Sequence, residues 1–297
     1  MSQPDICVIF NPAAGKGQAA SRLAALGKRW GERALFQPTR HPGHAVDLAQ
    51  QAAQADFRIV VAAGGDGTVH EVANGLLRAR RPEIQFGIIA IGSANDYHAS
   101  LAMEPLADPE AIRTVDVGVV RGTGGREKYF VCCLGLGLNG AVTVESRKIK
   151  RLQGVALYGL ATLRALWYEY RCPRMELAID DQPVVIAPTL MLSVLAGRRE
   201  GGFVMAPRAS LYDGWLDFIH TGELSRWEVV KLLPRLALSG PPSDYPKVKQ
   251  GRCRKVKLTS EMPLVVHIDG EFFCLPKDNI RSLEIDVVPA ALTIAPL

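Results

Sequence analysis

Residues 60–71, VVAAGGDGTVHE, constrain the fold of this chain more than any other stretch. Residues 58–63 predict a short apolar strand of the kind found in parallel sheets, and residues 69–77 carry apolar side chains at helical spacing. The three glycines between them let the backbone approach a ligand closely, while a helix start presents free N–H groups and a partial positive charge. This junction therefore predicts an anion site suited to phosphate.

Two side chains of this junction leave alternatives open. Thr68, followed three residues later by Glu71, predicts a capping box, and a well-capped turn can equally bind nothing. Asp66 favours the site, because a carboxylate within an anion-binding loop repels phosphate unless a cation intervenes. We therefore expect a nucleotide with Mg²⁺ rather than a bare phosphate.

The familiar nucleotide motifs are absent. The segment Gly65-x-Gly67 continues with His70 where the dinucleotide fingerprint requires a third glycine. Gly15-Lys16 is followed by Gly17 where a Walker A loop requires Ser or Thr. Phosphate chemistry must therefore come from several loops acting together.

The length of 297 residues suits two ordinary domains, and 48% hydrophobic with 22% charged residues is a globular composition. No apolar run is long enough to span a membrane, and the first ten residues lack the features of a signal peptide. The six cysteines include no C-x-x-C pair, which argues against zinc and disulfides. We expect a cytoplasmic protein that is neither spanning nor exported.

The net charge of +5 suits an anionic membrane surface or phosphorylated ligands. The excess is too diffuse to indicate nucleic acid, and we expect no nucleic-acid partner. A homodimer remains open.

The first 120 residues alternate between strand and helix patterns, which predicts βαβ units and a parallel sheet. The expected strands are residues 6–10, 33–37, 59–63 and 86–91, and the expected helices are residues 19–29, 44–53 and 69–77. Parallel sheets bind ligands at the carboxyl ends of their strands. We therefore expect four loops to converge at one edge, namely residues 11–17, 39–44, 64–68 and 92–96.

The pattern changes after residue 118 to short strands separated by turns, which predicts a mainly β second domain. Expected strands are residues 129–133, 175–179, 184–194, 215–220, 256–259 and 264–268. Residues 148–171 instead predict a basic amphipathic helix, which either faces a membrane or covers the β domain. Residues 222–244 predict a helical insertion.

Candidate ligand-binding side chains follow the strands of the first domain. Asn11, Gly15 and Gly17 can donate to phosphate, and Lys16 supplies a point charge. Ser93 and Asn95 are further donors, and Asp96 is either a capping acid or a metal-side carboxylate. Three acids, Asp66, Asp96 and Asp116, lie near strand ends, where they either share a hydrogen-bonded or Mg²⁺-linked network or form separate turns.

The second domain contains two acidic turns and a basic strand. Asp213, with nearby carbonyl groups, either binds a hard cation or forms a plain Asp-Gly turn. Asp269 and Glu271 flank a glycine, and two acids so close tend to differ in pKa, which leaves one better suited to accept a proton from an attacking hydroxyl. Basic residues precede this turn and indicate a solvated edge strand or a membrane-facing patch: Arg252, Arg254, Lys255 and Lys257.

Taken together, these motifs resemble the diacylglycerol kinase catalytic-domain family of lipid kinases, which includes YegS-like, sphingosine and ceramide kinases. The resemblance covers nearly the whole chain. It consists of five ordered motifs: N-P-x-x-G-x-G at residues 11–17, G-G-D-G-T at 64–68, V-D-x-G with its last three residues at 116–118, D-G-x-L-D at 213–217 and D-G-E at 269–271.

The resemblance implies an α/β fold of two domains with the active-site cleft between them. Residues 1–120 would form a Rossmann-like, NAD kinase- and phosphofructokinase-like parallel domain, to which residues 287–297 return. Residues 121–286 would form a mainly β-sandwich domain that binds the lipid. ATP and Mg²⁺ are the implied cofactors.

The resemblance also implies roles for individual residues. Thr39, residues 64–68 and Ser93 would contact ATP, and Asp213 with the carbonyl groups of Ser210 and Trp215 would hold a structural Mg²⁺. Glu271 would accept the substrate proton, with Asp269 as the competing base. The predicted catalytic residues are thus Glu271, Asp269 and Asp66, and the predicted nucleotide-binding residues are Asn11, Gly15, Lys16, Thr39, Gly64, Gly65, Asp66, Gly67, Thr68, Ser93 and Asn95.

Two positions depart from the family pattern. Residues 92–96 read GSAND where the family usually has G-T-G-N-D, so Ala94 adds a methyl group where a glycine backbone approaches the ligand. Cys132-Cys133 stands where an asparagine is common, which puts the usual polar contact between domains in doubt.

We therefore predict a lipid kinase of lipid metabolism that transfers the γ-phosphoryl group of ATP to the hydroxyl of a lipid such as diacylglycerol. It would be cytoplasmic and would contact anionic membranes peripherally. Two alternatives stay open: a kinase of the NAD kinase type with a soluble substrate, and a non-catalytic lipid-binding regulatory homologue.

Overall fold

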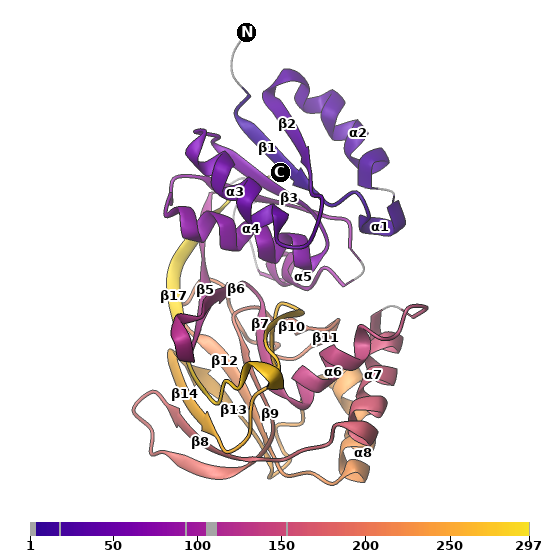
Figure 1. Ribbon diagram of the computed structural model, residues 1–297, viewed down its shortest axis with the longest axis vertical. Helices are drawn as coiled ribbons and strands as arrows, with labels where there is room; N and C mark the ends of the chain where they lie inside the picture. Colours follow the sequence, from indigo (N-terminus) through magenta and orange to yellow (C-terminus); the bar gives the residue numbers. More distant parts are fainter. Residues whose placement is uncertain (1–3, 18, 93, 105–111, 153, 297) are drawn as a thin grey trace. The chain divides into compact units, whose positions relative to one another are not determined.

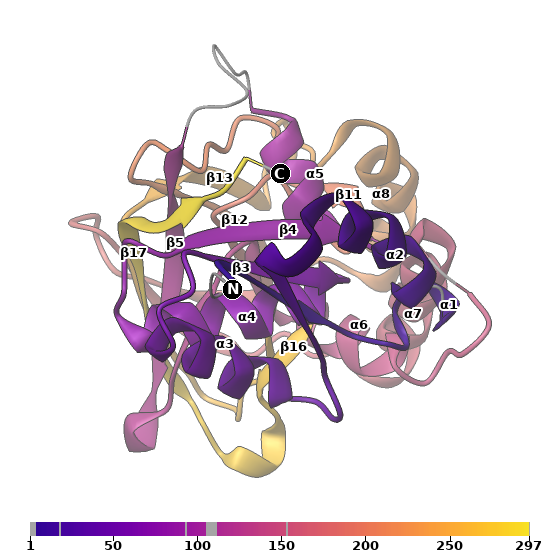
Figure 2. The same ribbon diagram turned by 90° about the horizontal axis from the view of Figure 1, so that it is seen from above.

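The chain divides into two compact units in the computed structural model, which describes residues 4–17, 19–92, 94–104, 112–152 and 154–296 (Figures 1 and 2). Unit 1 comprises Met1–Asp116 and Ala290–Leu297, and unit 2 comprises Val117–Pro289. The sequence places these boundaries at residues 120 and 287, a few residues away.

Unit 1 is a parallel sheet with helices on both faces, as the alternating pattern predicts. The strands lie in the order β2, β1, β3, β4, all parallel, and Thr293 and Ile294 of β17 add a further parallel pairing to β4. Its elements are β1 Ile6–Phe10, α1 Ala14–Gly17, α2 Ala19–Trp30, β2 Ala34–Pro38, α3 His44–Gln54, β3 Ile59–Gly64, α4 Asp66–Ala79, β4 Gln85–Ala90 and α5 Asp96–Ala102.

Burial explains the composition of the central strand of unit 1. Every residue of β3 is buried, because helices cover both faces of the sheet. Leu23 of α2 packs with Val8 and Val61 on one face. The helices α3 and α4 pack closely against each other, since a Cβ atom on Gly75 would lie 2.5 Å from the carbonyl oxygen of Val46.

The predicted capping box at Thr68 and Glu71 is wrong. The helix α4 begins at Asp66, its N-cap is Gly65, and no side chain caps it. Glu71 instead accepts hydrogen bonds from the backbone N–H groups of Gly43, at 2.8 Å, and Ala45, at 3.1 Å. Glu71 therefore caps the neighbouring helix α3, a contact that depends on tertiary packing.

Unit 2 is a mainly antiparallel, β-sandwich-like domain. Its principal strand order is β16, β15, β7, β9, β8, β14, β17, and β12 lies between β9 and β13. Its elements are β5 Arg113–Gly122, which begins in unit 1, β6 Glu127–Phe130, β7 Cys133–Gly137, α6 Leu138–Ser146, α7 Gly154–Tyr168, β8 Arg174–Ile179, β9 Val185–Leu195, β10 Arg199–Glu200, β11 Phe203–Val204, β12 Leu216–Gly222, α8 Arg226–Ser239, β13 Val248–Cys253, β14 Lys255–Ser260, β15 Val266–Ile268, β16 Glu271–Cys274 and β17 Ser282–Ile294.

The helices of unit 2 include one that the sequence does not predict. The expected helices at residues 148–171 and 222–244 correspond to α7 and α8, whereas α6 is unexpected. Its residues 142–144, Val-Thr-Val, are β-branched and favour strands over helices. Packing of α6 against α7 and β7 overrides that preference.

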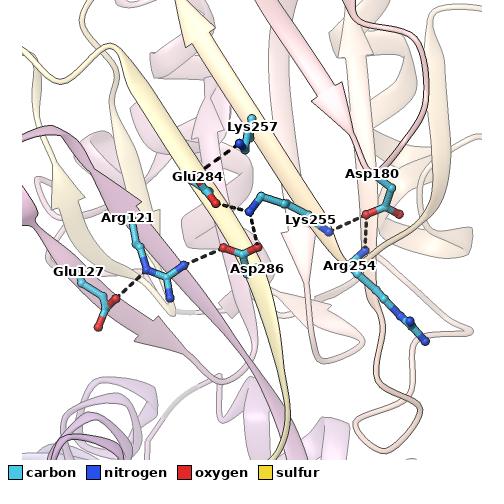
Figure 3. Close-up of polar contacts among 8 residues, drawn as sticks. All are labelled: Arg121, Glu127, Asp180, Arg254, Lys255, Lys257, Glu284 and Asp286. Carbon is cyan, nitrogen blue, oxygen red and sulfur yellow. Dashed lines mark hydrogen bonds and ion pairs between the residues drawn. The ribbon is translucent and has the colours of Figure 1, made fainter.

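The basic strand β14 is not a solvated edge, because it pairs with β8 on one side and with β17 on the other. Figure 3 shows its lysines facing acids of β17: Lys255 pairs with Glu284 and, at 3.2 Å, with Asp286, and Lys257 lies 3.9 Å from Glu284. Arg121 also binds Asp286, at 2.7 Å. These matched charges do not supply the positive excess that a membrane-facing patch requires.

None of the helices in the described part of the chain is both long enough and apolar enough to cross a membrane.

We predict that His220 makes unit 2 more stable as pH rises. His220 is buried on β12, 2.9 Å from the hydroxyl of Thr189, and burial, with Lys249 nearby, lowers its pKa to about 4. A depressed histidine pKa disfavours the folded state at acid pH, and the penalty disappears as pH rises from about 4 to the unfolded value near 6.5.

Urea unfolding of wild type and the His220→Gln variant tests this. The free energy of unfolding of wild type, relative to that of the variant, should rise by about 2–3 kcal/mol between pH 4 and pH 7. The exposed His98→Gln change is the control. A pH-independent difference for His220→Gln would contradict the prediction.

Candidate active site

Four loops meet at the carboxyl edge of the parallel sheet in unit 1. The backbone N–H of Thr39 donates to Phe10 at 2.8 Å, and that of Asn11 donates to Ala63 at 3.2 Å. Ile91 and Gly92 both donate to the carbonyl group of Gly64, at 2.8 and 3.1 Å. The loops after β1, β2, β3 and β4 are therefore hydrogen-bonded to one another or to the neighbouring strand end.

Glycine is required where these loops touch. A Cβ atom on Gly92 would lie 2.4 Å from the Cα of Gly65, and a Cβ atom on Gly15 would lie 2.9 Å from the side chain of Ile91. Gly15 also has a φ of +59°, which favours glycine. Side chains at these positions would push the loops apart, so the glycines determine how tightly the loops gather.

Asn95 folds the loop after β4 back upon itself. Its Nδ2 donates to the carbonyl group of Gly92 at 2.8 Å, and its backbone adopts φ of 51°. Among the described residues its Oδ1 is buried and has no hydrogen-bond partner. Leaving a buried oxygen unpaired is costly, so this atom suits a ligand that donates a hydrogen bond. The glycine-lined edge and this oxygen fit a nucleotide.

The three acids of unit 1 lie in different environments. Asp96 is buried in the first turn of α5. Asp66 lies at the start of α4 and accepts a weak hydrogen bond, at 3.4 Å, from the backbone of Tyr97 in α5. Asp116 is buried and accepts from the backbone of Ala290 at 2.9 Å. Asp116 thus anchors the segment that returns to unit 1.

The other predicted nucleotide-binding residues fall into three groups. Gly67 lies in the first turn of α4, and Thr68 is buried there with its hydroxyl against Gly64. Asn11 accepts from the backbone of Ala13 at 2.9 Å, which shapes the loop after β1. Ser93 and the side chain of Lys16 lie outside the described residues.

In unit 2 the Asp269 carboxylate is held by three backbone N–H groups. Val131 donates to Oδ2 at 2.9 Å, while Cys132 and Cys133 donate to Oδ1 at 2.9 and 3.0 Å. Asp269 is buried and adopts φ of 50°. Both of its oxygens are engaged in holding the start of β7, an arrangement that favours a structural role.

Glu271 has a different environment two residues later. Its side chain is 42% exposed and accepts from Arg147 at 2.8 Å. The same guanidinium donates to the carbonyl group of Gly270 at 2.9 Å and packs over Phe272. Glu271 is thus oriented by Arg147, and of the two acids it is the one whose carboxylate is exposed. The sequence offers no signal for Arg147, whose role depends on α6.

In the predicted metal-binding turn of unit 2, the carboxylate of Asp213 already has partners. Asp213 accepts from the backbone of Trp215 at 3.1 Å and forms an ion pair with Arg252. The hydroxyl of Ser210, which is not the carbonyl group predicted as a ligand, accepts from the backbone of Tyr212 at 3.3 Å. A metal ion at Asp213 would have to displace the guanidinium of Arg252.

A buried polar cluster that the sequence does not predict joins β7, β10 and β15. Ligand-type atoms of Cys133, Glu200 and His267 lie within 4.8 Å of one another. Glu200 already accepts from Ser193 at 2.8 Å, from Asn139 at 2.9 Å and lies 3.0 Å from His267. A hydrogen bond with Cys132 and burial hold the pKa of the Cys133 thiol well above its usual value. Because Glu200 already has these three partners, the cluster forms an internal hydrogen-bonded network.

The chain is similar to known proteins over most of its length. Residues 5–122 match the diacylglycerol kinase catalytic domain, and residues 133–296 match the YegS C-terminal NAD kinase beta sandwich-like domain. A diacylglycerol kinase of Bacillus subtilis is 27% identical, covering 89% of each chain. A protein of Chromohalobacter salexigens named "Probable lipid kinase YegS-like" is 30% identical, covering 89% of this chain and 84% of the relative.

Solved structures share the fold. A diacylglycerol kinase of Bacillus anthracis has a TM-score of 0.70 at 18% identity, covering 99% of this chain and 98% of that one. A yeast NADH kinase has a TM-score of 0.51 at 8% identity, covering 99% of this chain and 83% of that one. The fold is thus that of the diacylglycerol kinase and NAD kinase class. This chain belongs to the diacylglycerol kinase catalytic-domain family, together with the YegS-like lipid kinases.

We predict that Asp269 and Glu271 differ in their effect on stability. Asp269→Asn places an amide N–H₂ group against backbone donors, and should lower the free energy of unfolding by about 2–4 kcal/mol. Glu271→Gln removes an exposed ion pair and should change it by less than about 1 kcal/mol. Urea unfolding measures both, and equal losses would refute the assignment of Asp269 as structural.

Proposed function

We propose that this protein is an ATP-dependent lipid kinase that transfers the γ-phosphoryl group to the hydroxyl of a lipid such as diacylglycerol. The observation that carries the proposal is the gathering of glycine loops at the carboxyl edge of the unit 1 sheet, in a chain of this family. The lipid class is taken from the names of the relatives.

Unit 1 binds the nucleotide in this proposal. The loops at Gly15, Gly64 and Gly65 offer backbone N–H groups to phosphate oxygens, supported by the partial positive charge at the start of α4. Thr39 and Asn95 supply further polar contacts at the same edge. Phosphoryl transfer depends mostly on positioning and charge stabilisation, which such loops provide.

Mg²⁺ bound with ATP would neutralise the phosphate oxygens. We propose that Asp66 holds it, because Asp66 lies at the start of α4, in the glycine loop that follows β3. No step of the reaction is assigned to the turn at Asp213, whose carboxylate is paired with Arg252.

Glu271 accepts the proton of the attacking hydroxyl. Its exposed carboxylate can reach a substrate, whereas Asp269 would have to give up hydrogen bonds from three backbone donors. Asp269 shapes the turn that presents Glu271, and Arg147 fixes the direction of the Glu271 side chain.

We predict that Glu271→Gln lowers kcat by about 10²–10⁴-fold, the range for loss of a general base. The affinity for ATP should stay within about twofold, since Glu271 belongs to unit 2 and the proposed nucleotide loops to unit 1. The measurement is incubation with labelled ATP and a panel of lipid extracts, followed by identification of the labelled product. Glu127→Gln, which removes an exposed acid paired with Arg121, is the matched control.

Each outcome of this assay separates the alternatives. Near-normal turnover by Glu271→Gln would reject Glu271 as the base. Phosphorylation of NAD but of no lipid would favour the soluble-substrate kinase. If the wild-type protein consumes no ATP with a lipid or with NAD, the result would support the non-catalytic homologue.

We further predict that Ala94→Gly strengthens nucleotide binding. Ala94 lies beside Asn95 in the loop after β4, at the position where the family usually has glycine. Removing its methyl group should lower the KM for ATP about two- to tenfold, because the loop backbone can come closer to the ligand. An unchanged or higher KM, measured with the lipid that the panel identifies, would contradict this.

A further inference from the structure

The helices α7 and α8 carry a group of exposed apolar side chains. Trp167 and Trp227 are each 75% exposed and Tyr168 is 67% exposed. We call the whole group the α7–α8 apolar face, and it consists of Val155, Leu160, Leu163, Trp167, Tyr168 and Trp227. Large exposed apolar patches mark interaction sites, because a monomer gains nothing from leaving indole rings in water.

The α7 helix is apolar on two sides. Its inner side buries Ala161, Ala165 and Leu166, which pack within unit 2. Its outer side exposes Leu160, Leu163 and Trp167, which follow one another at helical spacing. A helix that only covered the β domain would carry polar residues on this outer side, so the second apolar side needs another explanation.

Hydrogen bonds fasten α7 to the start of α8. The Nε of Arg226 donates to the carbonyl group of Leu166 at 2.8 Å, and the hydroxyl of Tyr170 donates to Leu224 at 2.5 Å. Trp167 and Trp227 are sequence neighbours of the first pair, so the two exposed indoles lie in the parts of the chain where α7 and α8 are linked. Figure 1 shows α7 and α8 next to each other in unit 2.

The segment that contains α7 is basic. Residues 147–171 contain six basic residues and one acidic residue. Three of the basic residues bind acids of unit 2: Arg147 binds Glu271, whereas Lys148 and Arg164 bind Glu145. Within the described ranges Lys150, Arg151 and Arg171 are exposed and form no ion pair. These cations are available to an anionic partner.

We propose that the α7–α8 apolar face docks the protein on an anionic lipid bilayer. Indole rings and aliphatic side chains beside unpaired Lys and Arg are the combination that places a helix in the membrane interface. The basic rim complements acidic headgroups. This inference rests on the proposed function in one respect, since docking would deliver a membrane lipid to the kinase.

Ion pairs at the end of α6 connect α7 to Glu271, the candidate base. Glu145 of α6 is buried and binds Arg164 of α7 at 2.7 Å. Two residues later Arg147 binds Glu271. A bilayer bound at α7 is therefore linked to Glu271 through residues 145–147, which carry one ion pair to Arg164 and another to Glu271.

Vesicle binding without ATP tests the proposal. Wild type should cosediment with vesicles of phosphatidylcholine and phosphatidylglycerol in roughly equal amounts. The double variant Trp167→Ser, Trp227→Ser should lower the partition coefficient about tenfold or more. The double variant Lys150→Gln, Arg151→Gln should lower it by about fivefold per charge on these vesicles, and much less on pure phosphatidylcholine. Ile186→Ser on β9, which removes a 59% exposed apolar side chain, is the matched control and should bind like wild type.

Activity separates docking from catalysis. All of these variants should keep wild-type turnover on a short-chain diacylglycerol dissolved as monomers, and circular dichroism should report an unchanged fold. Failure to phosphorylate any lipid would reject the proposed function but leave the vesicle result readable. Wild-type vesicle binding by the tryptophan variant would overturn the docking proposal. So would light scattering that shows a wild-type dimer and a tryptophan-variant monomer, since a second copy would then cover the face.

Discussion

The contact between Gly65 and Gly92 brings the loops of the sheet edge together. A Cβ atom at Gly92 would lie 2.4 Å from the Cα of Gly65, so the two backbones can meet only without side chains. The contact joins the loops after β3 and β4, and Gly15 adds the loop after β1 through its approach to Ile91. Backbone donors of separate chain segments thereby come to lie at one edge, and the buried strand β3 holds that edge rigid.

The two acids of the Asp269-Gly270-Glu271 turn divide their tasks by environment. Asp269 is surrounded by three backbone donors that use both of its oxygens, whereas Glu271 is exposed beside a single arginine. A carboxylate that organises backbone cannot easily move toward a substrate, because each lost hydrogen bond leaves a buried donor unpaired. The turn thus fixes the carboxylate of Asp269 and leaves that of Glu271 exposed.

Charge matching distinguishes two basic segments of unit 2, the strand β14 and the residues just before α7. On β14, Lys255 and Lys257 face the acids of β17, so this basic strand is internally neutralised. The exposed cations before α7, Lys150 and Arg151, have no such acids among the described residues. The acids of β17 therefore neutralise the basic strand β14, whereas the segment before α7 keeps its positive charge.

Local patterns in the sequence determined four strands and the three longest helices of unit 1, because a fully buried strand such as β3 and an amphipathic helix are set by residue spacing. The short helices α1 and α5 were not predicted. Local patterns also determined the motifs that place the chain in its family. Only the tertiary structure decided which residues these motifs contact: Glu71 caps another helix, Asp213 pairs with Arg252, and α6 forms against its β-branched composition. Each of these depends on segments far apart in the chain, and a linear pattern carries no information on which distant group will lie beside a side chain.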